Sequence, residues 1–145
     1  MRYVILFLCF PILFTFSARE IEAQSAAASP IENITWQLAM LNGKAITVES
    51  NQRRPFMRLN AENKGLGAYA GCNTIGGDYE LKSNQLKIKV GPTTMMFCEG
   101  KMELEQSFIK ALESVTSWKI EEARLIISAG EKVVAEFRRP VRARQ

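Results

Sequence analysis

Two cysteines, Cys72 and Cys98, are the side chains in this sequence best suited to chemistry. Cys72 lies in the glycine-rich stretch GAYAGCNTIGGDYEL (67–81), and Cys98 ends the stretch TTMMFC (93–98). A cysteine nucleophile needs a neighbouring base, most often histidine, and the chain contains no histidine. Composition therefore excludes cysteine–histidine catalysis and histidine-bound zinc, and we expect no catalytic residue, no metal and no other cofactor.

Residues 1–23 have the pattern of a secretory signal. Arg2 precedes an apolar run at 4–16, which is shorter than the roughly 20 residues that a membrane helix needs. Small residues allow cleavage after Ala23 or Ala28. We therefore expect export to the periplasm or cell envelope with removal of this segment, and an uncleaved membrane anchor is the alternative.

Export leaves two cysteines in the mature chain. Cys9 lies inside the apolar run, without the small residues that would precede a lipidated cysteine, and is lost with the signal. Cys72 and Cys98 then enter an oxidising compartment, where we expect them to form a structural disulfide. Two free buried thiols that pack as small apolar side chains are the alternative.

The glycines around Cys72 predict a sharp corner. The stretch lacks both the lysine and the following helix of a phosphate-binding loop. Glycine permits positive φ and close backbone approach, and an asparagine amide can bond to nearby backbone groups. We expect a strand to end near residue 70 and another to begin near 78, with a corner between them that brings Cys72 toward Cys98. The residues expected to shape it are Gly71, Asn73, Gly76 and Gly77.

The two cysteine-containing stretches together form the candidate binding surface. Its residues are Gly71, Asn73, Gly76, Gly77, Thr93, Thr94, Met96 and Phe97. Asp78 and Glu80 could be proposed as a general acid and base, but a strand acid beside a glycine corner more often bonds to backbone. The methionines at 95, 96 and 102 lack the repeated spacing of a Cu(I) site, so we interpret them as core or pocket lining.

Short runs of alternating apolar and polar residues predict a mainly β fold. Strands are expected at 34–41, 44–48, 55–60, 65–71, 77–82, 85–90, 116–120, 124–128 and 132–137, with tight turns such as Asn42-Gly43. Residues 101–114 instead repeat apolar side chains at helical spacing, and Glu103 and Glu105 lie near the start, where the helix dipole favours acids. We expect an antiparallel meander that curls into a small barrel-like sheet, with this amphipathic helix packed on it.

The net charge of +4 comes from the C-terminal tail. Residues 24–137 carry 13 lysines and arginines against 13 aspartates and glutamates, and the excess is Arg138, Arg139, Arg142 and Arg144. A neutral body with a short basic tail is a poor nucleic-acid footprint, so we expect no nucleic-acid partner. The tail is either a solvated end or a weak tether to an anionic lipid or polymer.

Several of these motifs carry a resemblance to a known family. They are Trp36 and Leu38 in the first strand, GCN…GGDYEL at 71–81, TTMMFC at 93–98, and the helix with its closing strands. With them, residues 34–137 resemble the META domain family, which includes HslJ-like heat-shock proteins. Family members usually have Thr-Thr-basic-Met-Ala-Cys at 93–98, where this chain has Met95 and Phe97 in place of the basic residue and the alanine.

The resemblance implies a small barrel-like β domain with a packed helix, in exported or envelope proteins linked to heat stress, antibiotic tolerance and virulence. It supplies no catalytic mechanism. We expect a signal at 1–23, a linker at 24–33, the META domain at 34–138 and a basic tail at 139–145.

We therefore expect an exported, non-enzymatic binding or stabilising module of the envelope, related to stress, and weakly membrane-associated through its N-terminal segment or its tail. A carrier of an apolar ligand is one alternative, with an interior void lined by Trp36, Phe56, Met96 and Phe108. A secreted protein-binding or inhibitor factor, with Phe97 exposed, is another.

Overall fold

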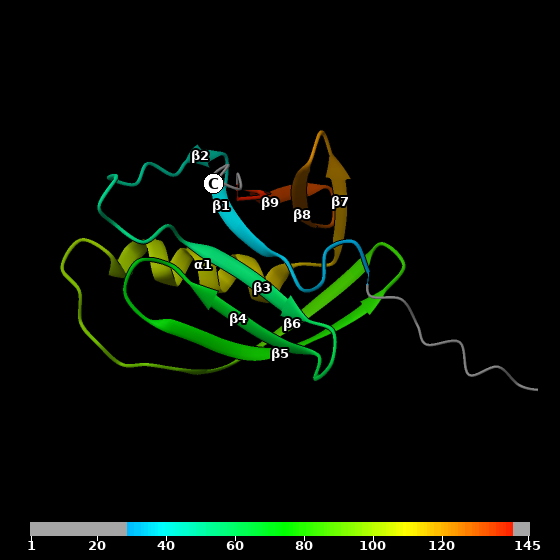
Figure 1. The fold of residues 1–145 in the computed structure, drawn as a ribbon, viewed down its shortest axis with the longest axis horizontal. Helices are drawn as coiled ribbons and strands as arrows, with labels where there is room; N and C mark the ends of the chain where they lie inside the picture. The colour runs from blue at the N-terminus through cyan, green and yellow to red at the C-terminus, as the bar shows by residue number, and fades with distance from the viewer. Residues whose placement is uncertain (1–28, 141–145) are drawn as a thin grey trace, which may run out of the picture.

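The computed structural model describes residues 29–140, which form a nine-stranded antiparallel sheet and one helix (Figure 1). The signal segment with Cys9 and its cleavage sites, and the tail beyond residue 140, lie outside the described residues. The elements are β1 (Thr35–Leu41), β2 (Lys44–Ala45), β3 (Phe56–Asn60), β4 (Gly65–Tyr69), β5 (Thr74–Lys82), β6 (Gln85–Thr93), α1 (Met102–Ser114), β7 (Ser117–Glu121), β8 (Arg124–Ala129) and β9 (Lys132–Arg138).

The sheet closes on itself. From β3 to β9 each strand pairs with the next along the chain, and β1 pairs with both β3 and β9, so that Leu38 stands opposite Phe137. Leu86 and Ile88 of β6 are buried while Lys87 and Lys89 are exposed, as the alternating pattern predicts. The expected mainly β, barrel-like fold with one helix is confirmed.

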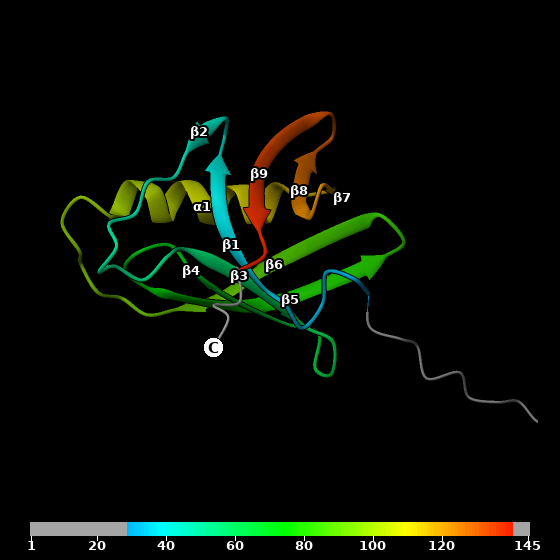
Figure 2. The same cartoon turned by 45° about the horizontal axis from the view of Figure 1, so that its top comes forward.

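The helix covers a weak seam in this ring. β6 and β7 share a single residue pair, Gln85 with Ser117, and α1 connects these strands and packs mainly on β6 (Figure 2). Phe108 and Leu112 of α1 are fully buried, and the Phe108 ring lies 6.2 Å from that of Phe137. The apolar stripe of α1 therefore supplies core where strand pairing is almost absent.

Three strands differ from their expected extents by three residues. β2 contains only Lys44–Ala45, β5 begins at Thr74 rather than at 77, and β6 continues to Thr93 rather than ending at 90. Gly76 and Gly77 therefore lie within β5 and not in a corner. A side chain at Gly77 would collide with the carbonyl oxygen of Lys89, so glycine permits the close approach of β5 and β6 at this irregularity in the ladder.

Residues 31–33 were expected to end a linker, but they pack into the fold. Ile31 is fully buried, and its carbonyl accepts a hydrogen bond from Trp36 Nε1 at 2.9 Å. Glu32 is also buried, with its carboxylate hydrogen-bonded to the backbone amide of Ser29, to Lys64 Nζ at 2.8 Å and to the Tyr79 hydroxyl. The domain is thereby anchored at its N-terminal edge to the β3–β4 turn and to β5.

Opposite pKa shifts mark the buried Glu32–Tyr79 pair. Burial alone would raise the pKa of Glu32, but the hydrogen bonds from Lys64, Tyr79 and Ser29, together with the Lys64 charge, hold it below the ordinary value. Burial, then the hydrogen bond to Glu32 and its negative charge, raise the pKa of Tyr79. The ionised carboxylate is thus the form that the fold stabilises.

Glu32→Gln should lower the free energy of unfolding at neutral pH by about 1 to 3 kcal/mol, because it removes the buried charged acceptor that three donors share. Because the folded-state pKa of Glu32 is depressed, its contribution is complete above the unfolded value of 4.5 and is lost as pH falls through the folded value. Urea unfolding across this pH range should therefore show the difference between wild type and variant shrinking on acidification. The exposed Glu62 provides the control, and an equal effect of Glu62→Gln would contradict the assignment.

Candidate functional site

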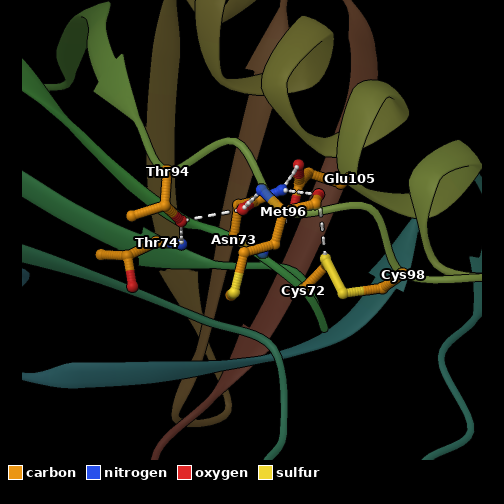
Figure 3. The surroundings of a disulfide bond; sticks show 7 residues. All are labelled: Cys72, Asn73, Thr74, Thr94, Met96, Cys98 and Glu105. Atoms are coloured by element: carbon orange, nitrogen blue, oxygen red, sulfur yellow. Dashed lines mark hydrogen bonds between the residues drawn. A yellow bond between two sulfur atoms is a disulfide. The ribbon is translucent and has the colours of Figure 1, made fainter.

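The β4–β5 corner brings the two cysteines together. Gly71 adopts φ +110°, a left-handed conformation that favours glycine, and turns the chain directly before Cys72. Cys72 and Cys98 form a disulfide, with their Cα atoms 5.8 Å apart (Figure 3). The expected pairing is present, and it ties the corner to the segment that connects β6 to α1.

Asn73 lies at the centre of this junction and is 2% exposed. Its Oδ1 accepts hydrogen bonds from Thr94 Oγ1 and from the Met96 backbone amide, both at 2.8 Å. Its Nδ2 donates to the Met96 carbonyl at 3.0 Å and to Glu105 Oε1 at 2.9 Å, and its backbone amide donates to Glu105 Oε2 at 2.7 Å (Figure 3). We call these contacts the Asn73 network; in it the side-chain amide has all its hydrogen-bonding groups satisfied.

Glu105 is the residue of this network that sequence reasoning missed. Its acidic character suggested a favourable charge near the helix start, yet its carboxylate is buried and bonds to Asn73 twice. A signal was present in the sequence, because Glu105 precedes Phe108 by three residues and Leu112 by seven. These spacings place a carboxylate on the apolar stripe, where a charged group needs a partner.

The residues that follow Thr94 form an exposed apolar loop, which we define as Met95, Met96 and Phe97. These side chains are 97%, 57% and 83% exposed. The backbone of Met96 is held on both its amide and its carbonyl by Asn73, and Cys98 is held by the disulfide. The loop is thus fixed in position while its side chains face solvent.

The structure gathers most of the predicted surface. Gly71, Asn73, Thr94 and Met96 meet at the junction, and Thr93 pairs with Ile75 at its edge. Gly76 and Gly77 lie further along β5, although a Cβ at Gly76 would be 3.3 Å from the Pro92 carbonyl oxygen.

The acids considered for catalysis lie apart from the junction. Asp78 and Glu80 are exposed on β5, directly across from Lys89 and Lys87 of β6. At the junction itself the cysteines carry no thiol, and the Thr94 hydroxyl is engaged with Asn73. Within residues 29–140, no three histidine, cysteine or acidic side chains are grouped to hold a metal ion.

The four residues proposed to line a void do not share one space. Trp36 and Phe108 are fully buried in the packed core, whereas Met96 faces solvent. Phe56 stacks on Tyr69, with ring centroids 6.1 Å apart and both side chains half-buried.

No helix in the described part of the chain has the length and apolar character to cross a bilayer.

Protein taken from its native source should show no alkylation of Cys72 or Cys98 until it is reduced. The measurement is intact mass with and without reduction, which should restore two protons. Reduction should also lower the free energy of unfolding by about 3 to 4 kcal/mol, because the bond closes a long loop in the unfolded chain. Alkylation of both cysteines without reduction would contradict the disulfide.

Glu105→Gln should destabilise the domain by about 1 to 3 kcal/mol, because it replaces one of the two carboxylate oxygens that accept from Asn73 with an NH2 group, which would face an N–H donor. Hydrogen exchange at the Met96 amide should accelerate more than exchange in β8. Glu103→Gln, on the exposed side of the same helix turn, is the matched control. Equal exchange at Met96 in both variants would show that Glu105 does not support the loop.

Comparison with known proteins identifies the family. No curated protein matches the chain. Two solved structures share its fold. One, described as an NMR structure of a protein from Burkholderia xenovorans, has a TM-score of 0.59 at 19% identity and covers 83% of this chain and 97% of its own. The other, also an NMR structure, has a TM-score of 0.56 at 19% identity and covers 74% of this chain and 90% of its own.

A family model for the META domain matches residues 29–141. The chain therefore belongs to the META domain family.

Proposed function

We propose that this META domain protein is an exported, non-enzymatic module of the cell envelope that binds or stabilises a protein partner, with a role in stress. The observation that carries the binding role is the fixed, exposed apolar loop. The signal-like pattern of residues 1–23 and the oxidised cysteine pair support export, because disulfides persist in oxidising compartments.

The apolar loop has the properties of a preorganised contact surface. Large contiguous apolar patches on a protein surface commonly mark interaction sites. Here Met95 and Phe97 project from a backbone fixed by the Asn73 network, so a partner would not have to order the loop. Binding to a rigid loop avoids much of the entropy cost of association.

The site chemistry supports a non-enzymatic role. A nucleophile needs a base within hydrogen-bonding reach, and the hydroxyl of Thr94 instead donates to an amide oxygen. Asn73 and Glu105 satisfy each other, so neither presents a free group to a substrate. What projects into solvent at the junction is methionine and phenylalanine, which serve contact better than proton transfer.

Phe97→Ser should abolish capture of an envelope partner and change the free energy of unfolding by no more than about 0.5 kcal/mol, because the side chain is exposed. The measurement combines affinity capture from envelope extract with photo-crosslinking from position 97, and thermal unfolding of each variant. Val133→Ser is the control, since Val133 is an exposed apolar residue of β9, 40% accessible and outside the loop. Undiminished capture by Phe97→Ser, or equal loss in Val133→Ser, would refute the loop as the contact surface.

A further inference from the structure

The outer surface of β1, β3 and β9 carries a cluster of arginines that the proposed function does not use. A shallow depression there is lined by Thr35, Gln37, Arg53, Arg54, Phe56 and Arg58. Arg138 of β9 stands directly across from Gln37, so it lies on the same face. We define the arginine face as Arg53, Arg54, Arg58 and Arg138, all of which are exposed.

Acidic side chains do not neutralise this face. Within residues 29–140, none of the four guanidinium groups lies within 4.0 Å of a carboxylate oxygen. The acid on the neighbouring part of β9, Glu136, is bonded to Arg124 at 3.2 Å. On β5 and β6, by contrast, each exposed acid faces a lysine on the neighbouring strand: Asp78 lies across from Lys89, and Glu80 lies across from Lys87. The fold therefore concentrates positive charge on one side of a body whose charges nearly cancel.

Aromatic rings hold one of the arginines in place. The guanidinium of Arg53 lies 4.7 Å from the ring centroid of Phe56 and 4.8 Å from that of Tyr69. Stacking on two rings limits the rotamers of this long side chain and leaves its N–H groups available at the ring edges. Arg53 is thus preorganised to bind an anion.

Beside the depression, two glycines leave the surface of the sheet without side chains. Arg58 is paired with Gly67 of β4, and Gly67 is paired in turn with Gly76 of β5. A Cβ at Gly67 would meet no atom within 4 Å, so the surface beside Arg58 is open. An extended chain can lie across these strands and contact several arginines at once.

We propose that the arginine face binds an extended polymer with phosphate groups in its backbone, such as a polyol-phosphate chain. Guanidinium groups bind phosphate oxygens through paired N–H donors. Strands lie about 4.8 Å apart, and side chains on one face recur about every 6.6 Å, so the arginines can meet successive phosphates of one chain.

Two other anionic partners fit this face less well. Single-stranded nucleic acid binds by stacking bases on free aromatic rings, but Arg53 lies over both rings here. A bilayer surface favours apolar side chains that insert beside basic ones, and the aromatic residue of the depression, Phe56, is half-buried beneath Arg53.

The test measures binding of the purified full-length protein to long-chain polyphosphate at low ionic strength, by fluorescence titration. Arg54→Gln/Arg58→Gln should weaken binding at least about fivefold, since it removes two charge-assisted contacts without disturbing stacked Arg53. Lys87→Gln/Lys89→Gln makes the same change in net charge on β6, where both lysines face acids, and should alter binding less than about twofold.

Four results would overturn the proposal. Equal weakening by the two double variants would show that net charge alone drives binding. Preferential binding to phosphatidylglycerol vesicles would make a membrane the partner, and tighter binding to an oligodeoxythymidine strand would make it a nucleic acid. An absence of polyphosphate binding would refute the site outright. Phe97→Ser should leave polyphosphate binding unchanged, so this proposal and the loop contact fail separately.

Discussion

The buried amide of Asn73 is the interaction on which the junction depends. It joins three pieces of the chain: Asn73 itself lies in the corner after β4, and its partners come from the segment after β6 and from the helix α1. A buried polar group without partners costs free energy, so each of these pieces must be in place for the others to be stable. The disulfide between Cys72 and Cys98 joins two of these pieces, the corner and the segment after β6.

This arrangement explains how an apolar loop can stay exposed. Exposed methionine and phenylalanine side chains in a flexible segment would collapse onto the nearest apolar surface. Here the backbone of Met96 is fixed by Asn73, and the disulfide follows at Cys98, so the side chains of Met95 and Phe97 cannot reach the core. The free energy of the buried network therefore maintains a surface that would be unfavourable by itself.

A second buried carboxylate plays a comparable part at the other end of the described chain. Glu32 joins the segment before β1 to Lys64 and Tyr79, much as Glu105 joins the helix to the corner. In both places an acid is buried with its acceptors occupied, which fixes one arrangement of segments that are distant in sequence. The closed sheet supplies the core. The Glu32 carboxylate positions the segment before β1, and the Glu105 carboxylate positions the corner after β4 against the helix.

The sequence by itself determined the periodicity, and from it the fold class. Alternation in strands such as Gln85–Thr93 and helical spacing around Phe108 depend on local geometry, so the mainly β fold and its helix could be predicted. The cysteine pair and the glycine corner could also be proposed. The expected start of β5 is later than the observed start at Thr74, because Gly76 and Gly77 are typical of a turn. In the structure these glycines instead permit the close approach of β5 and β6.

Only the tertiary structure decided which distant residues meet. The partnership of Asn73 with Glu105 spans 32 residues, and that of Glu32 with Tyr79 spans 47, so neither follows from local spacing. The arginine face could not be predicted from the equal numbers of acidic and basic residues in the body of the chain. It forms because the strand register brings Arg138 beside Gln37 and Arg58 beside Thr35. Side-chain pairing across strands depends on how the chain closes, and closure is a property of the whole sheet.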